Sequence, residues 1–348
     1  METIAAGAER AAPAGLLGSG GGAATPSPLQ RVRRSRWTVL GALLAAAAAV
    51  AAALLTAAPP GPVASGTVSV LSHVRWEFLP VLVLLSVLHF VCSAVALRAA
   101  AGWPIPLYET TLAQFTAAAA NRVTPGGLGA VAVNTRYLVC RGLPLSRAVV
   151  TVAVVQVAGV PADLLLMGAV VAFGGADGRV LDAMGRHAAQ AAGLVPPVPL
   201  LIAGGVLLPM AALWGRRAAR SAVVGRAVAG FTDLCRRPRD LGVTLAGSAA
   251  TTFVLGLAFA LSVLAVPGTG AGPADVLVLV AAYLVGAAAG AAIPSPGGVG
   301  STEAALVAAL ASLGIAAGPA LHAVLLFRGV TFWAPVPVGL LTCRTLRR

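Results

Sequence analysis

The sequence predicts an all-α polytopic membrane protein, and three observations support this fold class. Of the 348 residues, 58% are hydrophobic and only 10% are charged, whereas a soluble domain carries about 25% charged residues. The mean hydropathy is +0.91. Apolar runs long enough to cross a bilayer, about 20 residues each, recur along the chain between short polar loops. These observations exclude a soluble globular protein.

The net charge of +13 comes from arginine alone, because the sequence contains no lysine. This excludes lysine-dependent chemistry, such as Schiff-base catalysis or the lysine of a phosphate-binding GxxxxGK[ST] loop. The arginines gather at the ends of the apolar runs, which is typical of the cytoplasmic loops of membrane proteins. We therefore interpret the charge as a sign of membrane topology and expect no nucleic-acid partner.

The chain divides into a short tail and one membrane domain. Residues 1–30, rich in glycine, alanine and proline, are expected to form a disordered tail. The membrane domain, 31–348, holds about eight expected segments: 37–58, 77–100, 107–140, 148–173, 198–214, 241–266, 275–314 and 319–341. Residues 215–240 are expected to form a basic cytoplasmic loop with seven arginines.

Arginine counts also give the orientation. With both termini and the 215–240 loop in the cytoplasm, 18 arginines lie inside and three lie outside, as the positive-inside rule requires. In that orientation segment 107–140 begins and ends inside, and segment 275–314 begins and ends outside. Each segment is interrupted by a proline- and glycine-rich break. We therefore predict two re-entrant hairpins made of broken helices.

The two breaks share a six-residue pattern, TPGGLG at 124–129 and SPGGVG at 295–300. The order of span, broken hairpin and span over 77–173 recurs over 241–341 with opposite orientation. An inverted-topology repeat with broken helices is typical of transporters. The alternative interpretation is that both patterns are ordinary turns in a chain with 41 glycines and 24 prolines.

A broken helix at membrane depth has a chemical use. Proline ends the incoming helix and glycine permits close backbone approach. The outgoing half-helix then begins near the middle of the bilayer, where its N–H groups and positive dipole end attract anions such as phosphate. Gly126, Gly127, Gly297 and Gly298 are therefore predicted to contact a phosphate-bearing head group.

Four ionisable residues at membrane depth are the main candidates for substrate binding: Arg122, Asp163, Glu303 and Arg328. Arg122 has a guanidinium suited to phosphate, and Asn121 beside it is a weaker candidate. Glu303 and Asp163 would balance charge or contact a cationic head group. The alternatives are snorkelling for the two arginines and capping of the second half-helix by Glu303.

The remaining polar residues indicate no catalytic or metal site. Glu109 and Gln114 are expected near a solvated end of the first hairpin, and His89 and His322 are expected to be structural. The four cysteines have no metal-ligand spacing to each other or to histidine. We therefore expect no metal and no cofactor.

Two segments carry a resemblance to a known family. NRVTPGGLG at 121–129 and PSPGGVGSTE at 294–303 resemble the lysylphosphatidylglycerol synthase transmembrane region. This flippase-like family also forms the N-terminal half of the bacterial multiple-peptide-resistance factor. The resemblance covers about residues 35–345. By the motif match, it implies that Arg122 and Glu303 are functional positions. It implies about eight membrane segments in a bacterial inner membrane and movement of a charged lipid between leaflets.

The resemblance also shapes the expected function. Full-length members carry a soluble aminoacyl-transferring domain that this sequence lacks, so we expect a translocase and not an enzyme. Its substrate would be a phosphate-bearing phospholipid or polyprenyl-linked lipid. The main alternative is a non-transporting membrane partner of a lipid- or glycan-modifying enzyme. A third is an intramembrane enzyme with Glu303 and Asp163 as acid and base, against which the lack of a nucleophile counts.

Overall fold

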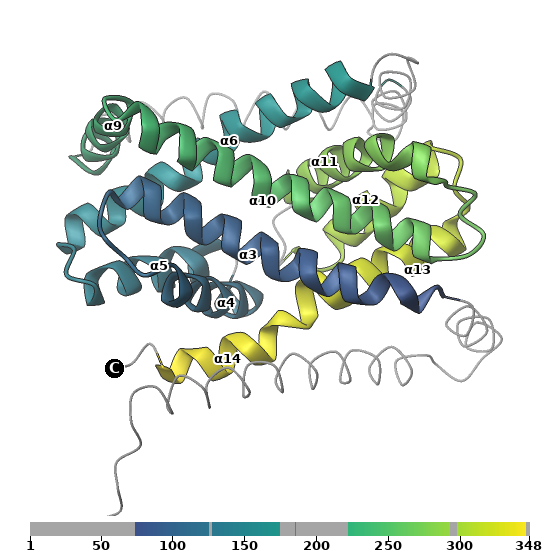
Figure 1. Cartoon of the computed structure of the whole chain (residues 1–348), viewed down its shortest axis with the longest axis horizontal. Helices are drawn as coiled ribbons and strands as arrows, with labels where there is room; N and C mark the ends of the chain where they lie inside the picture. The colour runs from purple at the N-terminus through teal and green to yellow at the C-terminus, as the bar shows by residue number, and fades with distance from the viewer. Residues whose placement is uncertain (1–73, 125–126, 175–184, 186–221, 293–297, 346–348) are drawn as a thin grey trace, which may run out of the picture. The chain divides into compact units, whose positions relative to one another are not determined.

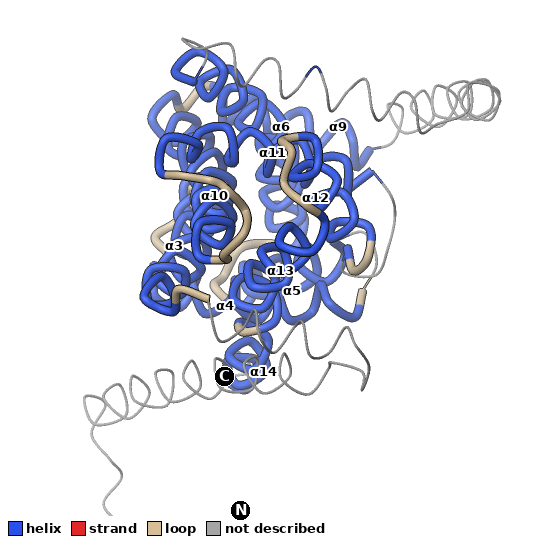
Figure 2. Tube along the Cα trace, turned by 90° about the vertical axis from the view of Figure 1, so that its right-hand side faces the viewer, coloured by secondary structure: helices blue, strands red, loops and turns tan. Residues whose placement is uncertain are grey.

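The described part of the chain is helical. The computed structural model describes residues 74–124, 127–174, 185, 222–292 and 298–345. Outside these residues lie the predicted tail 1–30, the predicted spans 37–58 and 198–214, and Gly126 and Gly297. Within the described ranges every regular element is a helix, so the all-α prediction is confirmed there (Figure 2).

The helices follow the predicted segments closely. They are α3 (Leu79–Ala101), α4 (Leu107–Val123), α5 (Leu128–Cys140), α6 (Leu145–Gly174), α9 (Ala222–Cys235), α10 (Pro238–Ala265), α11 (Val276–Ala292), α12 (Ser301–Ser312), α13 (Ala317–Arg328), the π-helical turn η6 (Gly329–Trp333) and α14 (Pro335–Thr345). Among the described residues, five stretches are long and apolar enough to cross a membrane: Trp76–Ala101, Leu145–Phe173, Pro238–Ala265, Pro273–Ala291 and Ala317–Thr342.

Helices α3 and α10 form an antiparallel pair along which the other helices are arranged (Figure 1). Just before α3 begins, the Arg75 N–H donates to the carbonyl of Ala265 at the end of α10, at 2.9 Å. Midway, Gly247 of α10 packs closely on α3, since a Cβ there would lie 3.1 Å from Ala96. In lipid, such close packing of small residues supplies the van der Waals contact that holds helices together.

Helices α4 and α5 pack against each other as a hairpin. At the break, Gly129 lies so close to α4 that a Cβ would stand 2.5 Å from the Ala120 backbone. At the open end, Arg141 forms an ion pair with Glu109, and the hydroxyls of Thr110 and Tyr137 lie 2.9 Å apart. Segment 107–140 therefore turns back on itself, and its two ends lie side by side.

Helices α11 and α12 form the second hairpin. A Cβ on Gly290 of α11 would lie 2.7 Å from the Cα of Thr302, near the start of α12. About one helical turn earlier in α11, a Cβ on Gly286 would lie 3.3 Å from the carbonyl oxygen of Ala305. The two helices thus run antiparallel in close contact on either side of the predicted break.

Two features were not anticipated from the sequence. Within the predicted loop 215–240, residues Ala222–Cys235 form helix α9, which packs against α6 and α10. The last span is not one uniform helix, because η6 separates α13 from α14. Such π turns are rare and are frequently found at functional sites.

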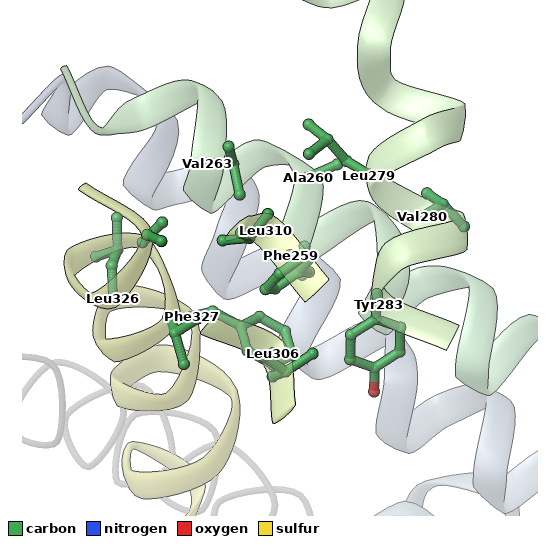
Figure 3. Packing of buried hydrophobic residues seen from close by; sticks show 14 of the residues in the cluster. Phe259, Ala260, Val263, Leu279, Val280, Tyr283, Leu306, Leu310, Leu326 and Phe327 are labelled. Carbon is green, nitrogen blue, oxygen red and sulfur yellow. The ribbon is translucent and has the colours of Figure 1, made fainter. Parts of the chain in front are cut away.

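The largest buried cluster joins α10, α11, α12 and α13 (Figure 3). Its centre is a group of three rings, Phe259, Tyr283 and Phe327, whose centroids lie 5.5–5.7 Å apart. Leu306 and Leu310 of α12 are fully buried within the same cluster. This core fixes the end of α13 against the start of α12, where the candidate site lies.

Candidate anion site

Two arginines that are 206 positions apart in the chain meet at one aromatic ring. Arg122 near the end of α4 and Arg328 at the end of α13 have their Cζ atoms 3.3 Å and 3.9 Å from the centre of the Phe332 ring. The ring belongs to η6 and is buried. Stacking on an aromatic face suits a guanidinium, which is planar and weakly hydrated.

Arg328 is neutralised by Glu303. Its Nε donates to Glu303 Oε1 at 2.7 Å, and the two side chains are only 10% and 18% exposed. A second donor of Arg328, Nη2, reaches the carbonyl of Gly298 at 3.1 Å. This pair ties the end of α13 to the start of α12. An ion pair buried to this degree needs such additional hydrogen bonds to offset the loss of hydration.

Glu303 has a second role at the same place. Its Oε2 accepts the N–H of Gly300, directly before α12, at 2.7 Å. The carboxylate therefore caps the half-helix, as one sequence interpretation expected, and also pairs with Arg328. Gly298 adopts φ +69°, and a Cβ there would lie 2.8 Å from Thr302 Oγ1. Only glycine suits this position, where the backbone carbonyl is turned toward Arg328.

Arg122, in contrast, has no ion pair among the described residues. Its Nη2 donates to the carbonyl of Phe332 at 3.2 Å, and its Nε has no hydrogen-bond partner in that same part of the chain. Arg328 on the same ring carries a like charge. Two like charges held on one ring repel each other. The arrangement therefore favours an anion beside Arg122.

The start of α5 is already capped from within the hairpin. Thr124 Oγ1 accepts the N–H of Gly129 at 2.9 Å, and Asn121 Oδ1 accepts the N–H of Ala130 at 2.7 Å. Gly127 stands at the N-cap with φ +75°. Asn121 thus shapes the break and takes one of the donors that the sequence interpretation assigned to phosphate. Arg122 is left as the principal donor of the first hairpin.

Asp163 stands apart from this cluster. It is exposed on α6, and Thr252 of α10 donates its hydroxyl to Asp163 Oδ1 at 2.7 Å. In the described part of the chain it makes no ion pair with either arginine of the cluster. The structure therefore brings together Arg122, Arg328, Glu303 and Gly298, with Asn121 and Gly127 at the adjoining break.

Phe332 and the turn that carries it were missed from the sequence. In η6 the Ala334 N–H donates to the carbonyl of Gly329, five residues earlier, at 2.9 Å. The carbonyl of Val330 then has no helical donor, because Pro335 lacks an N–H. Ser86 of α3 donates to it instead, at 3.3 Å. Prolines inside an apolar span were the available signal for this unpaired backbone.

Gln114 also differs from the prediction, since it is buried and not at a solvated end of the hairpin. Glu109, by contrast, lies at the open end of the hairpin beside Arg141. Across the described ranges, no group of three or more histidine, cysteine, aspartate or glutamate residues is arranged to hold a metal ion.

The fold and site together define a class: a helical multi-pass membrane protein with two packed, broken hairpins and a cluster of one buried and one half-buried arginine. The match to a protein-family model is more specific. Residues 63–339 match the model described as the lysylphosphatidylglycerol synthase TM region, and the chain belongs to this family. The resemblance seen in the sequence is thereby confirmed. Neither the curated proteins nor the solved structures searched include a match to the chain.

Proposed function

We propose that the protein moves a phosphate-bearing lipid between the two leaflets of the membrane. The proposal rests on one observation: the guanidinium of Arg122 is partly buried and has no carboxylate partner in the described residues. Neutral pairs such as Arg328 with Glu303 serve structure, whereas an uncompensated cation inside a membrane protein marks a path for a charged substrate. A lipid phosphate is the anion that a membrane supplies.

The proposal includes the inverted repeat predicted from the sequence, and the helix contacts support that repeat. In such a repeat α3 corresponds to α10, and hairpin α4–α5 corresponds to hairpin α11–α12. The two corresponding long helices run antiparallel. Each hairpin also contacts the last span of the other half, α4 against α14 and α11 against α6. A twofold axis in the membrane plane produces this reciprocal exchange, and rocking one half against the other would alternate access.

In this mechanism the phosphate lies beside the Arg122 guanidinium. The Nε–H, which has no acceptor among the described residues, donates to a phosphate oxygen, and the positive dipole end of α5 lowers the energy of the anion. The Arg328–Glu303 pair holds Phe332 and the second hairpin in place. The proposed mechanism binds and releases the lipid without breaking a covalent bond, so the proposal is a translocase and not an enzyme.

The direct test uses purified protein in sealed vesicles that contain tail-labelled phosphatidylglycerol. We expect the inner-leaflet label to become accessible to an external reductant much faster than in protein-free vesicles. Failure of the folded protein to move lipid in either direction would instead favour a non-transporting partner of a lipid- or glycan-modifying enzyme. Formation of a new lipid product would favour an intramembrane enzyme.

The proposed location is a bacterial inner membrane, with both termini and the basic segment around α9 in the cytoplasm. Cys140 and Cys235 are both exposed, so an impermeant maleimide should label them from the cytoplasmic side only. A cysteine at the exposed Ala274, before α11, should react only from the opposite side. The background for this test lacks Cys92 and Cys343.

The same measurement tests the hairpins. Tyr108 lies at the start of α4 and is exposed, so Tyr108→Cys should react from the same side as Cys140. Ala316→Cys, at the exposed start of α13, should react from the same side as Ala274→Cys. Opposite sidedness within either pair would mean that the hairpin crosses the membrane, and the re-entrant arrangement would be wrong.

A further inference from the structure

One aromatic residue of the last span holds the arginine of the first hairpin. The Arg122 Cζ lies 3.3 Å from the centre of the Phe332 ring, and Arg122 Nη2 donates to the backbone carbonyl of the same residue at 3.2 Å. Phe332 is only 4% exposed, so its ring has little freedom to move. Two contacts from one buried residue thus fix both the place and the plane of the guanidinium.

The stacking leaves donors of Arg122 available. The N–H bonds of a guanidinium lie in its plane, so an aromatic ring on its face uses none of them. Nη2 donates to the Phe332 carbonyl, while Nε has no acceptor in the described residues. A planar fork held in this way suits the oxygens of a phosphate. Without the ring, an anion would first have to order a long side chain with many rotamers.

The position of the ring depends on elements other than the first hairpin. Phe332 lies in η6, and Ser86 of α3 donates to the Val330 carbonyl of this turn at 3.3 Å. Arg328 stacks on the same ring, and its ion pair with Glu303 leads to the start of α12. The ring is therefore held by α3 and by the second hairpin, whereas the arginine that it holds belongs to α4.

Helix α4 also packs closely on α14, which follows the ring. Thr116 Oγ1 of α4 and Thr342 Oγ1 of α14 lie 2.9 Å apart, and both residues are buried. A Cβ on Gly339 of α14 would lie 2.3 Å from a backbone carbonyl oxygen of α4. A movement of α4 away from α14 would separate these contacts and draw Arg122 off the Phe332 ring.

We infer that Phe332 is a positioning residue for Arg122, and that it makes phosphate binding depend on the contact between α4 and the last span. The inference rests on the proposed function and adds the regulation of its site. While α4 packs on α14, the ring presents an ordered guanidinium to the phosphate. When the helices separate, the guanidinium loses this support and the phosphate dissociates. An affinity that differs between two conformations is what links a ligand to a movement.

The affinity is measured by titrating purified protein with dioctanoyl phosphatidic acid, whose head group is the phosphate alone. Phe332→Leu removes the ring and keeps the backbone carbonyl, so we expect the Kd to rise about tenfold, the order of a desolvated cation–π contact. Phe332→Tyr keeps an aromatic face and should restore most of the affinity. The matched control is Phe78→Leu, which removes another arginine–ring contact, that of Arg75 at 4.8 Å, and should leave the Kd unchanged.

The ring acts through Arg122, so its effect should depend on that residue. An Arg122→Lys protein has no planar fork to orient, and adding Phe332→Leu to it should change the Kd less than about twofold. An equal loss of affinity in both backgrounds would show that the ring acts on the fold alone, and would overturn the inference. Unchanged affinity in folded Phe332→Leu would do the same. If this variant does not fold, Phe332→Met, which fills more of the space, takes its place.

A disulfide tests the dependence on helix contact. Thr116→Cys with Thr342→Cys, in a background without the four native cysteines, places two thiols where hydroxyl oxygens now lie 2.9 Å apart. We expect the oxidised protein to bind the phosphatidic acid as tightly as the unmodified protein, and to move no lipid in vesicles until it is reduced. Weakened binding, or lipid movement at an unchanged rate, by the oxidised protein would contradict the regulation.

Binding and transport are measured separately, so the two proposals can fail independently. Unmodified protein that moves no lipid, but loses phosphate affinity in Phe332→Leu only when Arg122 is present, would contradict translocation and leave the role of Phe332 supported. Lipid movement together with a phosphate affinity that is indifferent to the ring would contradict the role of Phe332 and leave translocation supported.

Discussion

Substituting Arg122 by alanine is expected to slow lipid movement at least tenfold in reconstituted vesicles. Each hydrogen bond between a guanidinium and a charged oxygen contributes about 1.5–3 kcal/mol, and about 1.4 kcal/mol corresponds to a factor of ten. Arg122 is the one arginine of the cluster without a carboxylate partner in the described part of the chain. Its loss therefore removes the principal donor to the phosphate.

Two companion variants separate binding from folding. Arg122→Lys retains the charge but loses the planar donor set and the stacking on Phe332, so we expect it to restore only part of the rate. Arg239→Ala removes an exposed arginine near the start of α10 and should leave the rate unchanged. Wild-type transport by a folded Arg122→Ala protein would show that the phosphate does not bind here.

Breaking the pair of Glu303 and Arg328 is expected to give the largest loss of stability. Glu303→Gln leaves a buried guanidinium without its counter-charge, and removal of one partner of such a pair costs about 3–5 kcal/mol. The substitution also weakens the cap at Gly300. The decrease should appear as a lower melting temperature in mild detergent and as a lower free energy of unfolding in a denaturant titration.

The double variant Glu303→Leu with Arg328→Met tests the cause. Replacing both charges by apolar groups removes the uncompensated cation, so most of the lost stability should return. As a control, Glu77→Gln breaks the exposed pair with Arg75, whose side chains are 59% and 67% exposed, and should change stability by less than about 1 kcal/mol. A double variant as unstable as Glu303→Gln alone would mean that the contribution is not electrostatic.

The hairpins could be predicted from the sequence because local chemistry determines them. Proline and glycine interrupt helices wherever they occur in this pattern, and the arginine count at the loops required that segment 107–140 return to its starting side. The structure ends α4 at Val123 and begins α5 at Leu128, within the predicted break. The last span was harder. Its prolines indicate an unpaired carbonyl, but they do not show that a hydroxyl of α3 donates to it.

The partners within the site could not be predicted for a similar reason. Arg122 and Phe332 are 210 positions apart, and their contact exists only because α14 packs on α4. The sequence indicated four charged candidates, and the structure brings three of them into one cluster: Arg122, Glu303 and Arg328. It did not indicate which two neutralise each other, since that depends on the tertiary packing of α12 and α13.

The π turn sets the angular phase of α14 relative to α13. One residue of an α-helix corresponds to a rotation of about 100°, so rewinding η6 as regular α-helix would turn α14 by roughly that angle. Gly339 and Thr342 now face α4, where Thr342 Oγ1 lies 2.9 Å from Thr116 Oγ1. After such a rotation a bulkier side of α14 would meet α4. The winding of five residues thus governs how closely the last helix can approach the helix that carries Arg122.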